Sequence, residues 1–228
     1  MRFGMVGLVA TLALTVCVAQ AADNVVSEEE QAEGFVSLFD GKTLTGWEGS
    51  TDGYAVQDGA IVCMPGKGGL LVTDKDHADF VFRFEFRLEE GCNNGIALRS
   101  PATGNPAYSG MECQILDDVG FRKANDGKYA LQPWQVHASI YGVIPGKPNV
   151  LKVGEWNTEE IVLCGRYVRV TVNGQKVIEG KLPTSDQPTM DSPNEGGHHP
   201  GLDNTTGRIG FCSHNDKVEF RNLRVRDL

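Results

Sequence analysis

Residues 80–88 have the sequence Phe80-Val81-Phe82-Arg83-Phe84-Glu85-Phe86-Arg87-Leu88. Side chains along a β-strand point alternately to the two faces of its sheet. The four phenylalanines therefore share one face, and the charged residues of the stretch lie on the other. Aromatic side chains bury large apolar areas. This stretch therefore predicts a strand whose phenylalanine face anchors a packed core and whose other face lies outside that core.

Short apolar runs separated by Gly, Asp and Asn continue along the rest of the chain from residue 34. Regularly spaced short strands of this kind are typical of an all-β sandwich or barrel. The dipeptides Asp58-Gly59 and Asn173-Gly174 each stand between two such runs, where they predict two-residue hairpin turns. In the last run the alternation changes at Arg221-Asn222, which predicts a β-bulge. We expect a single all-β domain over residues 34–228, with no helix longer than a turn.

The first residues of the chain have the organisation of a secretory signal peptide. Arg2 precedes a short apolar run, and the run ends at Ala19-Gln20-Ala21, a typical cleavage sequence. The run is too short to be a good membrane span. We expect residues 1–21 to be removed and the protein to be secreted or periplasmic. Lipidation at Cys17 is the alternative.

The composition limits the partners that this chain can bind. Twenty-one basic and 30 acidic residues give a formal net charge of −9. A net negative chain without a lysine or arginine cluster is a poor match for nucleic acid or an anionic membrane. A neutral ligand such as a carbohydrate is compatible with it. Residues 22–33 are polar and rich in glutamate, so we expect them to form a flexible leader.

A second stretch, residues 108–118, contains candidate ligand-binding residues. If residues 111–116 form a strand, Met111, Cys113 and Ile115 share one face and Glu112 and Gln114 share the other. A carboxylate and an amide held in a row suit the evenly spaced hydroxyl groups of a sugar. The alternative is a solvated strand face that ends in a turn.

Several motifs occur in an order that is similar to one domain family. These are Phe39-Asp40-Gly41-Lys42-Thr43-Leu44-Thr45-Gly46-Trp47, Asn94-Gly95-Ile96-Ala97-Leu98-Arg99, Gly110-Met111-Glu112-Cys113-Gln114-Ile115-Leu116-Asp117, Tyr141-Gly142, Gly154-Glu155-Trp156-Asn157, Val172-Asn173-Gly174 and Phe220-Arg221-Asn222-Leu223-Arg224-Val225. The chain thereby resembles the 3-keto-disaccharide hydrolase domain family, described as 3-keto-glucoside 1,2-lyases and 3-keto-2-hydroxyglucal hydratases. The resemblance implies a concanavalin A-like jelly-roll sandwich of two antiparallel sheets, with a concave face that binds carbohydrate.

The resemblance also implies a reaction. A ketone at C3 of a glycoside acidifies the proton on C2, so a base can remove it and the group on C1 leaves by β-elimination. Water then adds to the resulting glucal. This chemistry needs a general base, a donor for the oxyanion at O3 and an acid for the leaving oxygen. Glu112 is the candidate base, with pairing to Arg99 as its alternative role. Gln114 is a candidate ligand for a sugar hydroxyl.

Other candidates follow with a structural alternative for each. Asp117 is a catalytic acid or a turn residue. Arg99 stabilises the oxyanion or forms an ordinary salt bridge. His137 and His214 act as acid or base, or are structural. Trp134 and Tyr141, the remaining candidates, stack on a sugar ring or pack in the core.

No metal or cofactor is assigned from the sequence. Asp117, Asp118, Asn125 and Asp126 offer oxygen ligands of the kind that calcium prefers, but their spacing fits no EF-hand. The cysteines and histidines have no zinc-site spacing. Two other functions stay open beside the enzyme, namely a carbohydrate-binding module of the same fold without catalysis and a scaffold domain of an exported assembly.

Overall fold

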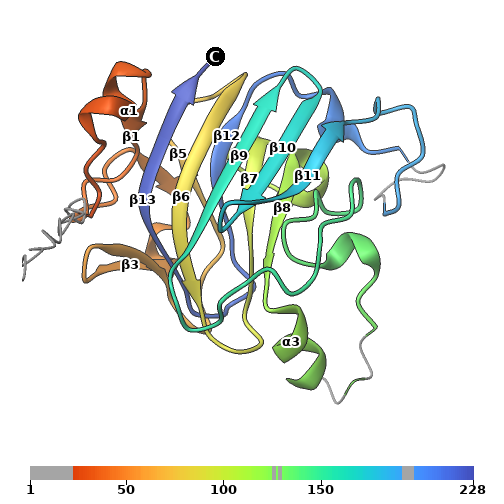
Figure 1. The fold of residues 1–228 in the computed structure, drawn as a ribbon, viewed down its shortest axis with the longest axis horizontal. Coiled ribbons are helices and arrows are strands. Elements are labelled where there is room, and N and C mark those ends of the chain that lie inside the picture. Colours follow the sequence, from red (N-terminus) through yellow and green to blue (C-terminus); the bar gives the residue numbers. More distant parts are fainter. Residues whose placement is uncertain (1–22, 125–126, 128–129, 192–197) are drawn as a thin grey trace, which may run out of the picture.

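A computed structural model describes residues 23–124, 127, 130–191 and 198–228. Two antiparallel sheets pack face to face (Figure 1). The eight-stranded sheet has the strand order β11-β10-β9-β6-β13-β4-β3, with β1 paired to β13, and the five-stranded sheet has the order β2-β5-β12-β7-β8. This confirms the all-β sandwich expected from the sequence. The predicted signal peptide lies outside the described residues.

The two longest strands, β13 and β6, lie side by side in the centre of the larger sheet. That sheet contains β1 (Val36–Ser37), β3 (Tyr54–Gln57), β4 (Ala60–Cys63), β6 (Phe80–Leu88), β9 (Asn157–Cys164), β10 (Tyr167–Val172), β11 (Gln175–Lys181) and β13 (Val218–Asp227). The five-stranded sheet contains β2 (Trp47–Gly49), β5 (Leu70–Thr73), β7 (Asn93–Ser100), β8 (Met111–Leu116) and β12 (Arg208–Cys212).

The aromatic face of β6 forms the centre of the core, as predicted. Phe80, Phe82, Phe84 and Phe86 are all fully buried. Across the interface, Phe211 of β12 stacks on Phe220 of β13 with ring centroids 3.9 Å apart. Aromatic contacts between the two sheets therefore hold the sandwich together.

The predicted turns and bulge are also present. Asp58 and Gly59 have φ of 48° and 75°, as a type I′ turn requires, and they join β3 to β4. The pairing of β13 with β6 shifts register between Arg221 and Arg224, and Asn222 has a φ of 52°. A left-handed residue at this position accommodates the change of alternation.

Short helices are the main departure from the expected pattern. They are α1 (Glu28–Ala32), α2 (Pro106–Ser109) and α3 (Asp118–Ala124), with 3-10 turns η1 (Thr51–Gly53), η2 (Pro133–Gln135) and η3 (Pro200–Asp203). The expectation of no helix longer than a turn was wrong for α3, which has seven residues. Among the described residues, no helix is long and apolar enough to cross a membrane.

The segment expected to be a loose leader packs on the larger sheet instead. Ser27 caps α1 by accepting a hydrogen bond from the backbone N–H of Glu30. The carboxylate of Glu30 contacts Arg83 of β6 and Arg224 of β13. The glutamates that suggested a solvated leader are thus partly used as partners for arginines of the sheet.

The five-stranded sheet continues beyond β8 through residues 137–141. The N–H of Ala138 donates to the carbonyl oxygen of Gln114 at 2.7 Å, and the N–H of Tyr141 donates to that of Glu112 at 2.8 Å. This pairing places Tyr141 beside the strand that carries the candidate base.

Candidate active site

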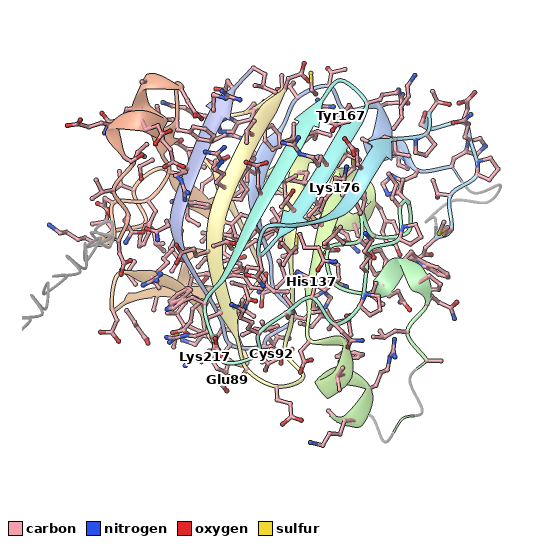
Figure 2. The ribbon with its side chains drawn as sticks, in the orientation of Figure 1. Glu89, Cys92, His137, Tyr167, Lys176 and Lys217 are labelled. Carbon is pink, nitrogen blue, oxygen red and sulfur yellow. The ribbon has the colours of Figure 1, made fainter. Side chains whose placement is uncertain are left out.

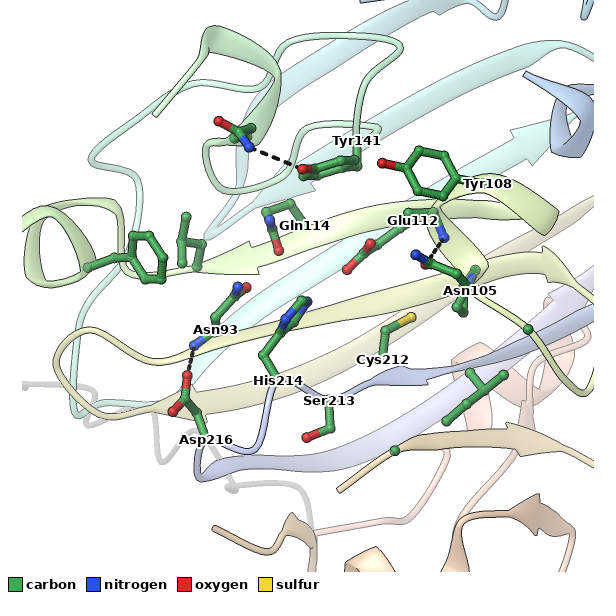
Figure 3. Close-up of a pocket in the computed structure, with 18 of the residues that line it drawn as sticks. Asn93, Asn105, Tyr108, Glu112, Gln114, Tyr141, Cys212, Ser213, His214 and Asp216 are labelled. Atoms are coloured by element: carbon green, nitrogen blue, oxygen red, sulfur yellow. Dashed lines mark hydrogen bonds between the residues drawn. The ribbon is translucent and has the colours of Figure 1, made fainter. Parts of the chain in front are cut away.

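A pocket of about 680 Å³ lies on the outer face of the five-stranded sheet (Figure 3). Met111, Cys113 and Ile115 of β8 face the core, so Glu112 and Gln114 point into this pocket. Both faces of β8 are therefore used, one for packing and one for the site. The lining consists of Gly69, Leu70, Asn93, Gly104, Asn105, Pro106, Ala107, Tyr108, Glu112, Gln114, Leu116, Phe121, Leu131, Gln135, Tyr141, Cys212, Ser213, His214 and Asp216.

Glu112 is held in an unusual state for a carboxylic acid. Its side chain is only 5% exposed, and its Oε1 atom has no hydrogen-bond partner among the described residues. Desolvation by burial raises the pKa of Glu112 to about 8. A carboxyl group with such a pKa exchanges protons near neutral pH, which suits a general acid or base.

A glycine of the neighbouring strand makes room for this carboxylate. A Cβ atom built on Gly95 of β7 would lie 1.9 Å from Oε1 of Glu112. A glycine inside a strand often marks such a close approach. The Glu112 side chain can therefore lie across β7 only because residue 95 has no side chain.

Two more acceptors of the pocket lack partners. The Oε1 atom of Gln114 and the Oδ1 atom of Asn93 are buried and make no hydrogen bond to any described residue. A buried acceptor left unpaired costs about 1–3 kcal/mol. A ligand that carries several hydroxyl groups would supply the missing donors to these acceptors and to Glu112.

The wall of the pocket opposite Glu112 is formed by the residues that follow the end of β12. Figure 3 shows His214 and Ser213 on this side, across the pocket from Glu112 and Gln114. Partial desolvation lowers the pKa of His214, and the nearby Asp216 carboxylate opposes the shift. The imidazole is therefore neutral at pH 7. Asp216 also accepts a hydrogen bond of 2.8 Å from the N–H of Asn93, which links this wall to β7.

Two tyrosines complete the pocket. Tyr108 comes from α2, and its hydroxyl lies 3.2 Å from Oδ2 of Asp191. Burial and this carboxylate raise the pKa of Tyr108 to about 12. Tyr141 comes from the segment that pairs with β8, and Figure 3 shows both rings on the Glu112 side of the pocket. None of the described residues that line the pocket is lysine or arginine, so its positive potential comes only from neutral donors.

The sequence model of the 3-keto-alpha-glucoside-1,2-lyase-like domain matches residues 34–226. The chain belongs to this family. A 3-keto-disaccharide hydrolase from Bacteroides thetaiotaomicron is 30% identical over a 234-residue alignment that covers 86% of this chain and 79% of that relative. These matches support a carbohydrate-active enzyme.

Solved structures agree with the family assignment. A crystal structure from Parabacteroides distasonis, provisionally named a glycosyl hydrolase, has a TM-score of 0.70 and 27% identity, and the match covers 91% of this chain and all of that one (100%). The carbohydrate-binding module CBM66 of Bacillus subtilis has a TM-score of 0.51 at 11% identity and covers 80% of this chain and 96% of that one. The second likeness shows the jelly-roll fold alone.

Four of the predicted site residues of this family member meet in the pocket, namely Glu112, Gln114, His214 and Tyr141. Trp134 does not line it. Asn93, Tyr108 and Gln135 also line the pocket, although they were not among the predicted site residues. The role of Gly95 could have been predicted, because a glycine within a strand pattern often marks a close approach of a neighbouring group.

Arg99 lies elsewhere, which corrects its proposed role at the oxyanion. Its φ of 44° interrupts the alternation of β7 and turns the side chain away from the pocket. The guanidinium donates to Oδ1 of Asp79 at 2.7 Å and to the carbonyl oxygens of Ala78 and Gly165. The salt-bridge alternative is therefore the one observed, with Asp79 as the partner instead of Glu112.

Asp117 also takes its structural alternative. Its carboxylate accepts hydrogen bonds from the N–H groups of Gly91 at 2.9 Å and Val119 at 3.2 Å. These contacts fix the turn from β8 into α3. Asp117 does not line the pocket that contains Glu112.

His137 lies inside the molecule (Figure 2), with no exposed surface. Its Nδ1 accepts a hydrogen bond from the N–H of Leu116, and its Nε2 lies 3.5 Å from Oε2 of Glu159. Burial lowers the pKa of His137 to about 3. Because the backbone of β8 separates it from the pocket, His137 cannot touch a ligand there.

The oxygen ligands considered for calcium are only partly described. Asn125 and Asp126 lie outside the described residues. Asp118 accepts a hydrogen bond from the N–H of His137 at 2.9 Å, so one of its oxygens already has a partner. Among the described residues, no group of three or more histidine, cysteine, aspartate or glutamate side chains could hold a metal ion.

Proposed function

We propose that this chain cleaves 3-keto-glycosides by C2 proton abstraction and β-elimination and then hydrates the 2-hydroxy-3-keto-glucal, so that the net reaction is hydrolysis. The observation that carries the proposal is the Glu112 carboxyl group. It is buried, its Oε1 has no partner among the described residues, and it faces a pocket with further unpaired acceptors. Membership of the family and the name of its 30% identical relative supply the substrate class.

Glu112 acts as the base in the first half of the reaction. The ketone acidifies the C2 proton, and the carboxylate takes this proton as the C2–H electrons move to form the enolate at O3. The C1–O bond then breaks. A pKa of about 8 suits this step, because the base is strong enough to remove a carbon-bound proton and is still partly ionised near neutral pH.

Water completes the reaction in the second half. Its hydroxide adds to C1, Glu112 returns its proton to C2, and the remaining proton of water neutralises the leaving oxygen. His214 lies on the wall opposite Glu112, where a neutral imidazole can hold first the leaving oxygen and then the attacking water. The enolate is stabilised by neutral donors, namely the hydroxyl and amide groups of the lining.

Turnover of an aryl 3-keto-glucoside beside the plain aryl glucoside tests this proposal. We expect the wild type to cleave only the keto sugar, and Glu112→Gln to lose about 10²–10⁴-fold in kcat, the usual contribution of a general base. The control is Glu155→Gln, the same substitution at an exposed position, which should keep full activity. Equal cleavage by wild type and Glu112→Gln would refute the role of Glu112.

The second candidate is a carbohydrate-binding module without catalysis. Amides and tyrosines around a pocket bind a sugar without any titration, and CBM66 has the same fold. Binding of a 3-keto-sugar in calorimetry, with no turnover by the wild type, would favour this candidate over the enzyme.

A further inference from the structure

The side-chain amide of Gln135 has a fixed orientation. Gln135 ends the 3-10 turn η2, and its Oε1 accepts a hydrogen bond of 2.9 Å from the backbone N–H of Gln132. A backbone N–H can only donate, so the atom that faces it must be the amide oxygen. This decides the usual ambiguity between the oxygen and nitrogen of a glutamine side chain.

The orientation of the Gln135 amide fixes the polarity of Tyr141, that is, whether its hydroxyl donates or accepts in the hydrogen bond between the two side chains. The Nε2 of Gln135 lies 3.1 Å from the Tyr141 hydroxyl, shown by a dashed line in Figure 3. An amide nitrogen can only donate, so the phenolic oxygen is the acceptor in this hydrogen bond. The proton of Tyr141 is therefore directed away from Gln135.

We propose that Gln135 is a positioning residue that holds Tyr141 as a hydrogen-bond donor to the oxyanion formed at O3 of the sugar. This inference rests on the proposed function and adds the group that stabilises the enolate. Arg99, the cation expected at this place, lies outside the pocket, and the described lining contains no other arginine or lysine. A polarised phenol then has to supply what a cation would otherwise supply.

The substitution Gln135→Glu tests this polarity because it keeps the shape of the side chain. One carboxylate oxygen can still accept from Gln132, but the other can only accept from Tyr141, so the tyrosine proton turns toward residue 135. We expect kcat to fall about 100-fold, the usual loss of one oxyanion donor, with KM changed less than about threefold. Gln135→Leu removes the amide donor without reversing the hydrogen bond, so its loss should be smaller than that of Gln135→Glu.

The pH dependence separates this role from a structural one. When it is protonated, the carboxyl group introduced by Gln135→Glu carries an O–H that donates to Tyr141 as the native amide does. The activity of Gln135→Glu relative to wild type should therefore recover as the pH falls toward about 4, near the ordinary pKa of glutamate. Gln135→Leu should show no such recovery. A Gln135→Glu variant that loses no more than Gln135→Leu, at a pH-independent ratio to wild type, would overturn the inference.

Two controls exclude a simple charge effect. In a Tyr141→Phe background, Gln135→Glu should cause no further loss, whereas repulsion between a carboxylate and the enolate would persist. Gln175→Glu places the same charge at an exposed position of β11 and should leave activity unchanged.

A readout without turnover separates this inference from the proposed function. In the free protein, the phenol pKa of Tyr141, followed by NMR, should rise in Gln135→Glu, because the phenol then donates to a carboxylate. An inactive wild type that shows this rise would refute the proposed reaction but keep the polarity. An active wild type without the rise would refute the polarity alone.

Discussion

Glu112, the proposed base, shows how the absence of one side chain can position another. Gly95 leaves the space in which the Glu112 carboxylate lies, so the position of that carboxylate depends on a residue without a side chain. A substitution at Gly95 can therefore test the position of the Glu112 carboxylate without removing the carboxylate itself.

Gly95→Ala should reduce kcat by about 10- to 100-fold, because displacement of a catalytic group by about 1 Å can lower the rate by about two orders of magnitude. The added methyl group would lie 1.9 Å from Oε1, so the carboxylate has to move. Gly180→Ala is the matched control, because a Cβ atom there meets nothing within 4 Å. Kinetics of both variants check this expectation, and unchanged turnover in Gly95→Ala would contradict it.

The activity should rise with pH through the pKa of Glu112. The proposed base, Glu112, would react only when ionised, and burial raises its pKa to about 8, so the acidic limb of the kcat/KM profile should have its midpoint near pH 8 instead of near 4 or 5. A pH–rate profile of the wild type from pH 5 to about 9.5 tests this. A midpoint below about pH 6 would show that Glu112 is more hydrated than the structure indicates.

At the scale of elements, β8 lies between the pocket and a polar cluster in the core. On its core side, Sγ of Cys113 is 3.4 Å from Oε1 of Glu159 in β9, and the other oxygen of Glu159 faces His137. Because Leu116 donates to Nδ1 of His137, the ring proton is on Nε2, which lies 3.5 Å from Oε2 of Glu159 without a hydrogen bond between them. Burial raises the pKa of Glu159 and lowers that of His137, so the cluster is neutral at pH 7 and links the two sheets.

Glu159→Gln should therefore remove part of the pH dependence of stability. The folded-state pKa of Glu159 is raised, so its contribution is fully present below the unfolded pKa, near 4.5, and is lost as pH rises toward the folded value. We expect the free energy of unfolding of the variant, relative to wild type, to increase by roughly 3–4 kcal/mol between pH 5 and 8. Urea denaturation at both pH values measures this, with Glu155→Gln as the exposed control. The same difference at both pH values would mean that Glu159 is ionised in the core.

At the scale of the whole molecule, the two outer faces of the sandwich have separate tasks. The outer face of the five-stranded sheet carries the pocket, and that of the larger sheet carries the N-terminal segment. There Phe35 and Val26 pack with Val81 and Val162, and the guanidinium of Arg83 lies 4.3 Å from the centroid of the Phe35 ring. The N-terminal segment therefore supports stability from the side opposite to the pocket.

Removal of residues 23–35 should lower stability without a change in kcat. A chain of residues 36–228 loses the Val26 and Phe35 contacts and the Glu30 ion pairs, at a cost of roughly 2–4 kcal/mol. Chemical denaturation and kinetics below the melting temperature, compared with residues 23–228, check both parts. A large loss of kcat in the folded protein would show coupling between the two faces.

Local pattern was sufficient for the features that depend on alternation and turn chemistry. Strand geometry acts over a few neighbouring residues. It was enough to predict the core face of β6, the hairpin at Asp58-Gly59, the bulge of β13 and the outward side of Glu112 and Gln114. The order of motifs was sufficient for the family. These features could be predicted because each is encoded within one short stretch.

Only the tertiary structure decided which polar residues share the pocket. Arg99 and His137 have suitable chemistry and lie near the correct strands in sequence, yet a left-handed φ turns one away and the core encloses the other. Asn93, Tyr108 and Gln135 join Glu112 from segments whose approach depends on sheet pairing. The raised pKa of Glu112 likewise requires burial, which is a property of the packed molecule. Distances across strands and the desolvation of a charge are set by contacts between distant residues, so no local pattern contains them.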